Sequence, residues 1–305
     1  MIHGKIGETL KRKIRAAVLT WYRRHERDLP WRYETDPYRV LVSEIMLQQT
    51  QVSRVLVMYP RFLKRFPTLA HLARARTSSV IRAWKGMGYN NRALRLQQLA
   101  RQVMKESGGT LPRSVDALRL LPGIGRYTAG AVASFAFGVQ VPVVDTNISR
   151  ILRRLFPPGS KATARHAGDE WAIAEELLPR GNAGRWNEAL MDLGATVCSA
   201  LSPRCGQCPL QELCPSAHKV SRKKARTAKA EPGRGGIPNR IYRGRIVEAL
   251  RSLKHGESIA SAALARKAMH DFHDGDRKWF GALLDSLERD GLVRRHKRSR
   301  VSLPA

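Results

Sequence analysis

The sequence predicts an all-α fold. Apolar residues recur at helical spacing along most of the chain, most clearly in residues 5–26 and 148–197. Short turns that contain glycine or proline separate these stretches. One turn, formed by Pro122, Gly123 and Gly125, cannot continue a helix. We therefore expect a hairpin between two helices at this point.

The charge of the chain indicates a polyanionic partner. The 305 residues include 55 Lys and Arg against 25 Asp and Glu, a formal net charge of +30. A charge of this size favours nucleic acid over a membrane as the partner. Residues 1–5 contain no apolar signal core, and glycine and proline interrupt the uncharged stretch of residues 127–144. We expect no membrane span and a cytoplasmic location.

A buried carboxyl group is predicted on the second helix. After a first helix over residues 5–26 and an irregular segment, Asp36 provides an N-cap and Pro37 the first turn of this helix. Glu44 lies between Val40 and Leu47 on a mostly apolar face. Burial favours the protonated form of a carboxyl group, which is the form that a general acid needs. The alternative is a glutamate at the rim of the core, paired with an arginine.

Polar side chains follow this glutamate directly. Gln48, Gln49 and Thr50 form a cluster of amide and hydroxyl groups. They offer donors and acceptors for base edges, or for the gap that an extruded base leaves in a duplex. An exposed helix face is the alternative interpretation.

Residues 53–110 are expected to form amphipathic helices. Their turns are predicted at Pro60, at Pro67 and at the glycines near residues 86 and 108. Arg92 and Arg95 follow one of these turns, and for each of them a solvated helix face is the favoured interpretation.

The helices on either side of the hairpin are predicted over residues 116–121 and 126–137. Gly123 and Gly125 let the backbone approach a partner closely and leave N–H groups unpaired at the start of the second helix. Such a helix terminus binds anions, and in a basic protein the expected anion is a phosphate. Asp145, which follows an apolar run, is either the N-cap of the next helix or a reactive group.

The combination of the hairpin and this aspartate is more specific than either part. Gly123, Gly125 and Asp145 occupy the positions of the motif that defines the helix-hairpin-helix–Gly/Pro–Asp superfamily of DNA glycosylases, which the chain resembles. The run from Ser43 to Val52, preceded by Leu29-Pro30-Trp31-Arg32, resembles the adenine DNA glycosylase family almost letter for letter. The resemblance covers roughly residues 20 to 215.

The resemblance implies roles for individual residues. Glu44 is the implied catalytic acid, and Asp145 the implied carboxylate that stabilises the positive charge on the sugar. Tyr127 and Asn147 are implied to position the two acids. The adenine pocket is implied to be lined by Arg27, Trp31, Leu47 and Glu188, although Glu188 is equally well interpreted as a helix-surface acid.

The resemblance also implies DNA-contacting residues. Gln49 fills the base stack near the extruded nucleotide, and Tyr89 enters the duplex as a wedge. The loop around Tyr89 reads Gly-Met-Gly-Tyr-Asn, where the family usually has Gly-Leu-Gly-Tyr-Tyr, so Met87 marks a departure. Gln48, Thr50 and the hairpin glycines complete this set.

Tyr127 predicts a monofunctional enzyme. In the endonuclease III branch of the superfamily, this position carries a lysine that attacks the sugar. Tyrosine cannot form a Schiff base. The expected product is an intact abasic site.

The four cysteines form one local site rather than a disulfide framework. Cys198, Cys205, Cys208 and Cys214 have the spacing C-x6-C-x2-C-x5-C. This spacing resembles the [4Fe–4S] site of the glycosylase branch and favours that cluster. Structural zinc is the general alternative for four clustered cysteines.

The predicted domains follow from these assignments. Residues 1–26 and 142–218 are expected to form an iron–sulfur helical domain, and residues 27–141 a six-helix domain that contains the hairpin, with the active site in the cleft between them. A basic linker over residues 219–240 leads to residues 241–305, which are too few for the Nudix-like domain usual in the family.

The last segment is expected to be winged-helix-like. Helices are predicted over residues 241–253, 259–269 and 276–290, followed by two short strands about a basic tip. A small helical domain for protein contact is the alternative.

The predicted function is that of a monofunctional DNA glycosylase of base excision repair. It would act as a nucleoid-associated monomer on double-stranded DNA with a mismatch or lesion, excising adenine opposite guanine or 8-oxoguanine. Two alternatives remain: a thymine or uracil mismatch glycosylase of the same fold, and a non-catalytic iron–sulfur regulator that binds DNA.

Overall fold

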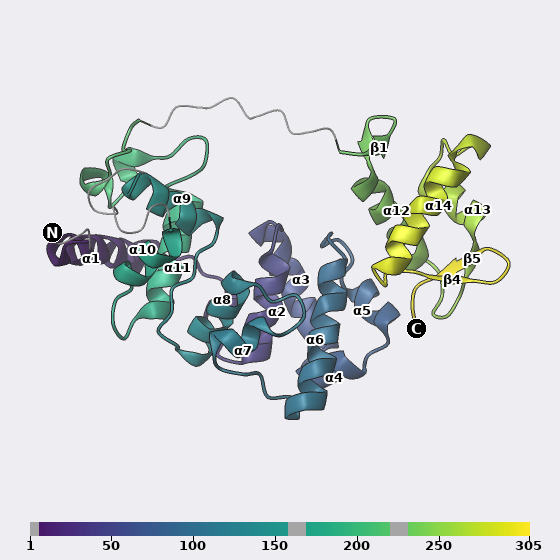
Figure 1. Cartoon of the computed structure of the whole chain (residues 1–305), viewed down its shortest axis with the longest axis horizontal. Coiled ribbons are helices and arrows are strands. Elements are labelled where there is room, and N and C mark those ends of the chain that lie inside the picture. The colour runs from purple at the N-terminus through teal and green to yellow at the C-terminus, as the bar shows by residue number, and fades with distance from the viewer. Residues whose placement is uncertain (1–5, 158–168, 220–230) are drawn as a thin grey trace. The chain divides into compact units, whose positions relative to one another are not determined.

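The computed structural model describes residues 6–157, 169–219 and 231–305. Fourteen α-helices dominate these residues and strands are few, which confirms the all-α prediction (Figure 1). No helix in the described part of the chain has both the length and the apolar composition needed to cross a bilayer. Half of the predicted linker, residues 220–230, lies outside the described residues.

The chain divides into two compact units. The first contains residues 1–41, 112–120 and 124–226, and the second contains residues 42–111, 121–123 and 227–305. The boundary between them falls within helix α2 (Pro37–Leu47).

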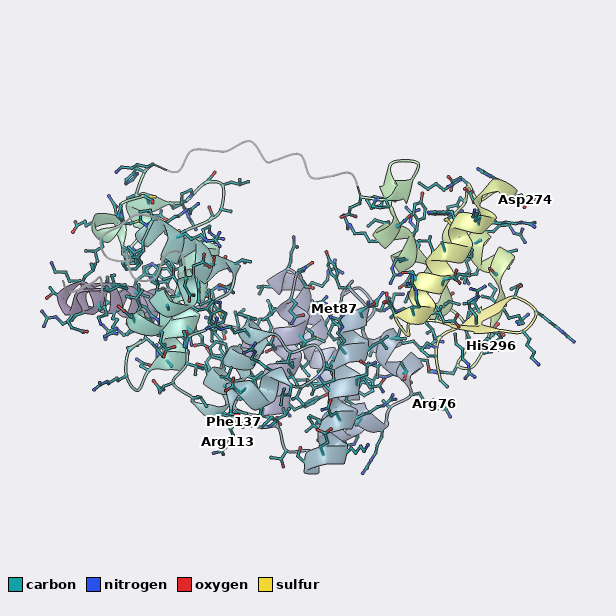
Figure 2. All side chains as sticks on the ribbon, viewed as in Figure 1. Arg76, Met87, Arg113, Phe137, Asp274 and His296 are labelled. Carbon is teal, nitrogen blue, oxygen red and sulfur yellow. The ribbon has the colours of Figure 1, made fainter. Side chains whose placement is uncertain are left out.

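The first unit is helical throughout its described length. Its elements are α1 (Glu8–His25), η1 (Pro30–Arg32), α7 (Val115–Arg119), α8 (Arg126–Phe137), α9 (Thr146–Leu155), α10 (Glu170–Leu177), α11 (Ala183–Thr196), η3 (Cys205–Gln207) and η4 (Gln211–Leu213). The helices predicted over residues 5–26 and 126–137 are confirmed as α1 and α8. Arg113, which precedes α7, lies over the ring of Phe137 at the end of α8 (Figure 2).

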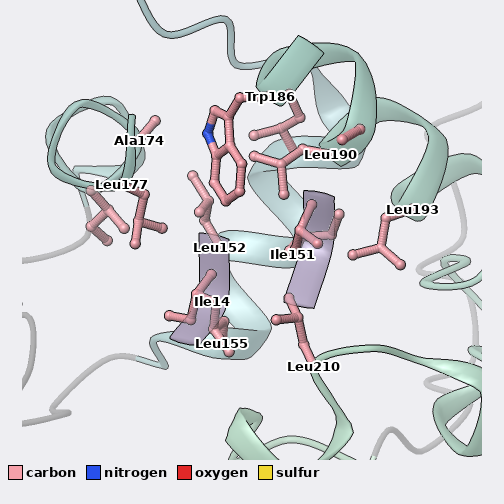
Figure 3. Close-up of a cluster of buried hydrophobic side chains, with 14 of the residues drawn as sticks. Ile14, Ile151, Leu152, Leu155, Ala174, Leu177, Trp186, Leu190, Leu193 and Leu210 are labelled. Carbon is pink, nitrogen blue, oxygen red and sulfur yellow. The ribbon is translucent and has the colours of Figure 1, made fainter. Parts of the chain in front are cut away.

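One hydrophobic core holds this unit together. Ile14 of α1, Ile151 of α9, Leu177 of α10 and Trp186 of α11 are all at most 3% exposed (Figure 3). Leu210, between two cysteines of the cluster motif, packs into the same core. The core therefore anchors the cysteine loop to the helix that begins after Asp145.

The second unit begins with the remainder of α2. It continues with α3 (Val52–Arg65), α4 (Leu69–Arg74), α5 (Thr77–Ala83) and α6 (Asn91–Ser107). The turn predicted at Pro60 is wrong, because Pro60 lies inside α3. Burial of Val55, Tyr59 and Phe62 on one face of α3 outweighs the cost of the proline.

The end of the chain forms a winged-helix-like arrangement in the same unit. Its elements are β1 (Gly233–Arg234), β2 (Ile237–Pro238), α12 (Asn239–Arg251), β3 (Ile259–Ala260), α13 (Ser261–Ala268), η5 (Asp274–Asp276), α14 (Arg277–Arg289), β4 (Arg294–His296) and β5 (Arg300–Ser302). The three strands β3, β5 and β4 pair antiparallel in that order, with Val301 opposite both Ile259 and Arg295. Part of the predicted linker, residues 233–238, instead forms a short antiparallel hairpin.

Candidate active site

The Asp145 carboxylate is held by hydrogen bonds at both oxygens. The backbone N–H of Ile148 donates to Oδ1 at 2.7 Å, and the Asn147 side chain donates to Oδ2 at 2.8 Å. Asp145 is therefore the N-cap of α9, as one of the two interpretations predicted. The Asp145 side chain is half-buried, and its two hydrogen bonds fix the orientation of the carboxylate. Its function as a helix cap is therefore compatible with a chemical role.

A chain of contacts links this aspartate to the cysteine loop. Arg150 of α9 donates to Asn147 Oδ1, to the carbonyl of Gly194 and to the carbonyl of Cys198, each at 2.7 Å. Because Asn147 donates to Asp145, the orientation of the carboxylate depends on the loop that contains Cys198.

Gly194 makes this arrangement possible. A Cβ atom at this position would lie 2.5 Å from Cβ of Asn147, a distance that side chains do not tolerate. Glycine thus allows α11 to approach α9 closely, directly beside the residue that holds Asp145.

A second polar cluster surrounds Asp192 of α11, which is fully buried. Arg27 donates to it from Nε at 2.6 Å and from its backbone N–H at 3.1 Å, and Arg32 donates at 2.6 and 2.5 Å. Two arginines compensate the buried carboxylate. Arg27 was predicted to line the adenine pocket, whereas no sequence pattern singles out Asp192.

Glu188 lies one helical turn before Asp192 and joins the same cluster. The Tyr22 hydroxyl donates to its Oε2 at 3.1 Å, and Arg32 Nε lies 3.9 Å from its Oε1. Its side chain is 16% exposed, so the interpretation as a helix-surface acid is wrong. Burial raises the pKa of Glu188, although Arg32 and the Tyr22 hydrogen bond act in the opposite direction.

Because the pKa of Glu188 is raised, the difference in the free energy of unfolding between wild type and Glu188→Gln should depend on pH. The unfolded chain releases this proton near the ordinary value of 4.5, while the folded chain keeps it to higher pH. The contribution of Glu188 to the free energy of unfolding is therefore fully present below pH 4.5. It falls as the pH rises from 4.5 through the raised pKa. Glu188→Gln should gain stability relative to wild type over that interval in urea unfolding experiments. A difference that stays constant with pH, or shrinks as the pH rises, would contradict this assignment.

Glu44 is buried at 5% exposure near the end of α2, with Ser43 and Ile45 also buried. The prediction of a buried rather than a rim position is confirmed. Leu47, the last residue of α2, is half-buried. Glu44 and Leu47 lie in the second unit, whereas Asp145, Arg27, Trp31 and Glu188 lie in the first.

Arg92 organises the loops that follow α2 and precede α6. Its guanidinium donates to the carbonyls of Ile45 at 2.9 Å and Met46 at 3.0 Å, and to that of Met87 at 3.0 Å. The residue is 8% exposed, so its predicted place on a solvated face is wrong. Burial lowers the pKa of Arg92 to about 10, and the carbonyls at the end of α2 accept from it in place of water.

These two loops carry the predicted DNA-contacting residues. Gln49 and Tyr89 are both exposed and both have positive φ, 53° and 41°, a conformation uncommon for residues other than glycine. Thr50 Oγ1 accepts from Arg92 at 2.9 Å, and Met87, two residues before Tyr89 in the chain, is buried. Strained, exposed side chains on a fixed scaffold are typical of contact residues.

The hairpin turn has the predicted form. Gly123 has φ of +78°, and a Cβ atom there would lie 3.0 Å from Cβ of Arg95. Gly125 is the N-cap of α8, and no side-chain cap hydrogen bond is formed at this helix terminus. Tyr127 lies half-buried in this first turn.

The four cysteines line one small cavity together with Arg154, Val197 and Gln211. No disulfide joins them. Burial raises the pKa of the Cys208 thiol to about 11 and also raises that of Cys214, so neutral pH leaves them protonated unless a metal compensates the thiolate charge.

The comparison with protein families agrees with this architecture. Residues 42–172 match the family described as "HhH-GPD superfamily base excision DNA repair protein", and residues 198–214 match the "Iron-sulfur binding domain of endonuclease III". The hairpin, the capped aspartate and the cysteine cavity thus define a base-excision glycosylase fold that holds a [4Fe–4S] cluster.

Comparison with individual relatives shows which family of glycosylases the chain belongs to. The adenine DNA glycosylase of Mycobacterium tuberculosis is 40% identical over 292 residues, which cover 94% of this chain and 92% of the relative. The chain belongs to the adenine DNA glycosylase family. The human adenine DNA glycosylase is 43% identical over 217 residues, 68% of this chain, and the match spans only 40% of the human protein.

Solved structures give the same fold. A thermostable thymine-DNA glycosylase superposes with a TM-score of 0.64 at 32% identity, over 70% of this chain and 98% of its own. Endonuclease III in a non-covalent DNA complex gives a TM-score of 0.59 at 25% identity, over 68% of this chain and 97% of its own.

Proposed function

We propose that this protein hydrolyses the N-glycosidic bond of adenine mispaired with guanine or 8-oxoguanine in double-stranded DNA. The observation that carries the proposal is Asp145. Its carboxylate is oriented at both oxygens by neutral donors, and no Lys or Arg of the described residues forms an ion pair with it. Such an anion is available to stabilise a positive charge that develops on a substrate.

The proposed chemistry uses two carboxyl groups in opposite protonation states. The target adenine leaves the helical stack, and Glu44 donates its proton to N7 of that base. The bond between N9 and C1′ breaks, the base takes the bonding electrons, and the sugar becomes oxocarbenium-like. Asp145 stabilises this cation, and water adds to C1′ and returns a proton to Glu44.

The base pocket is proposed to include the Glu188 cluster. Arg27 and Arg32 on Asp192 form a fixed floor, and the raised pKa of Glu188 favours a carboxyl that both donates and accepts. That pattern suits the adenine edge, which carries an amino donor beside a ring-nitrogen acceptor. Trp31 and Leu47 supply the apolar part of the pocket in this proposal.

The cluster is proposed to have a structural role. Cys198, Cys205, Cys208 and Cys214 supply four thiolates, which leave no open iron position for a hydrolytic water. When bound, the cluster contributes rigidity to the loop whose Cys198 carbonyl accepts from Arg150. Arg150 in turn holds Asn147 against Asp145.

A second candidate is excision of thymine or uracil from mismatches with guanine. The similarity to a thymine-DNA glycosylase at 32% identity favours it. The run from Gln48 to Gln51 and the relatives that cover over 90% of this chain favour adenine. In both cases Tyr127 in place of a lysine predicts an intact abasic strand.

A panel of four duplexes separates the candidates. The purified protein is incubated with A:8-oxoG, A:G, T:G and U:G duplexes, and each strand is then treated with alkali to reveal abasic sites. We expect cleavage at adenine after alkali and almost none before it. Cleavage at the pyrimidine would support the second candidate, and no cleavage would leave only a DNA-binding role.

A further inference from the structure

The winged-helix-like segment is docked on α5 by two arginines. Arg251, the last residue of α12, donates to the carbonyl of Ile81 in α5 at 2.8 and 3.0 Å. In return, Arg82 of α5 donates to the carbonyl of Arg251 and, at 3.3 Å, to that of Lys254. Each guanidinium thus satisfies carbonyls at the end of the other helix, where partners within the helix are lacking and a positive charge is favourable. The end of α12 therefore has a fixed position relative to α5.

The same Arg251 guanidinium also reaches the loop that carries Tyr89, which we call the Tyr89 loop (residues 86–90). Its Nη2 donates to Oδ1 of Asn90 at 2.9 Å, across 161 positions of sequence. The Arg251 side chain is 7% exposed and pairs with Glu248 at 3.1 Å, so its orientation is fixed. The contact joins the C-terminal segment to the residue that directly follows Tyr89.

Asn90 makes this contact in place of a local one. It is the N-cap of α6, a position where an asparagine side chain ordinarily accepts from the first turn of its own helix. Its side chain forms no such cap hydrogen bond with α6 and accepts from Arg251 instead. Asn90 is also a position at which the loop departs from the Gly-Leu-Gly-Tyr-Tyr sequence usual in the family. A capping residue that bonds a distant helix fixes its loop relative to that helix.

Tyr89 combines an exposed ring with a held backbone. Its φ is 41° and its side chain is 54% exposed. Arg92 donates to the carbonyl of Tyr89 from Nε at 3.4 Å, and its guanidinium lies 5.7 Å from the centroid of the ring. Arg251 holds the next residue. An exposed ring on a backbone that is anchored at two successive residues is preorganised for insertion between stacked bases.

We propose that Arg251 is a positioning residue that, through Asn90, holds Tyr89 in the conformation that enters the DNA duplex. The inference rests on the proposed function, in which the mispaired base leaves the helical stack of double-stranded DNA. It gives the winged-helix-like segment a part in opening the base stack that requires no contact between Arg251 and DNA. When the contact is lost, the Tyr89 loop must be ordered as DNA binds, and this ordering costs free energy.

The test follows the opening of the base stack by fluorescence, with the full-length protein. The probe is a duplex in which a non-hydrolysable 2′-fluoro-adenosine lies opposite guanine, with 2-aminopurine beside that mispair. 2-Aminopurine becomes brighter when a neighbouring base no longer stacks on it, so the rate of the rise at saturating protein reports the opening. Tyr89→Ala should remove most of the rise. If it left the rise unchanged, Tyr89 would not enter the duplex and the inference would fail.

A double-mutant cycle tests the contact itself. Asn90→Leu removes the acceptor and Arg251→Met removes the donor, and each should slow the rise about tenfold, the effect of losing one hydrogen bond to a charged group. The double variant should be no slower than Arg251→Met alone, because both substitutions remove the same contact. Asn90→Asp keeps an acceptor for Arg251 and should stay within about twofold of wild type.

Arg82→Met is the matched control for docking. It removes an arginine from the same interface but leaves the bond between Arg251 and Asn90 in place. It should lower the thermal unfolding temperature as Arg251→Met does, yet keep the rate of the rise within about twofold of wild type.

Three results would overturn the inference: losses that multiply in the double variant, a wild-type rate for Asn90→Leu, or equal slowing by Arg82→Met and Arg251→Met. A wild-type protein that does not release adenine from an ordinary A:G duplex would instead refute the proposed function. The two failures are distinguishable because the fluorescence rise on the non-hydrolysable duplex does not depend on turnover.

Discussion

Glu44→Gln should abolish adenine release while leaving DNA binding unchanged. Glutamine fits the buried site at the end of α2 and removes the transferable proton. General acid catalysis contributes about 10²- to 10⁴-fold, so single-turnover rates on an A:G duplex should fall by that amount. Affinity for the same duplex should stay at the wild-type value, because the substitution removes no charge from the DNA-facing surface.

A matched control is Glu106→Gln, on an exposed face of α6 in the same unit. It makes the same chemical change without altering a buried group and should retain full activity. If Glu44→Gln kept wild-type turnover, Glu44 would lose its role as the acid. If it lost affinity and turnover in parallel, the residue would serve binding alone.

Asp145→Asn should lower the excision rate by about 10²- to 10³-fold, as the removal of one electrostatic stabiliser of a transition state does. The amide keeps the shape of the side chain but loses the negative charge that we propose stabilises the sugar cation. It also weakens the cap on α9, so some stability loss is expected as well.

Asp169→Asn separates these two effects. Asp169 caps α10 in the same unit, accepting from the N–H groups of Trp171 at 3.0 Å and Ala172 at 3.3 Å. Both substitutions should cost about 1 kcal/mol or less in the free energy of unfolding. Only the change at Asp145 should slow base release, and an equal slowing by both would show that Asp145 acts merely as a cap.

Local features of the site were predictable because their causes are local. The hairpin needs glycine for its positive φ at Gly123, and Asp145 caps the helix that starts at the next residue. The burial of Glu44 follows from its apolar neighbours within the same helix. In each case the residues that determine the structure lie within a few positions of one another.

Features that depend on distant partners were not predictable. Arg92 binds carbonyls at the end of α2, more than forty residues away, and nothing in its own helix shows that acceptors lie there. Asp192 is satisfied by Arg27 and Arg32 from the opposite end of the first unit's sequence. From the sequence alone, an arginine near a predicted turn is ordinarily interpreted as solvent-exposed. The same holds for an acidic residue one helical turn after Glu188.

The position of the winged-helix-like segment is a further example. Its helices were predictable from periodicity, but its short strands β1, β2 and β3 were not, since two residues carry no alternating pattern. Arg251 donates a hydrogen bond to the carbonyl of Ile81, and the two residues are 170 positions apart in the sequence. A local sequence pattern therefore does not predict this contact.

In the proposed mechanism, two carboxyl groups hydrolyse the N-glycosidic bond of adenine in a mispaired duplex. The most direct test of this mechanism is to quantify the free base by mass spectrometry after a single turnover on A:8-oxoG and A:G duplexes, alongside the abasic sites on the same strand. We expect one adenine per abasic site, no strand break without alkali, and neither product from Glu44→Gln. Release of a pyrimidine from the matching T:G duplex with none of adenine, or equal adenine release by Glu44→Gln, would contradict the claim.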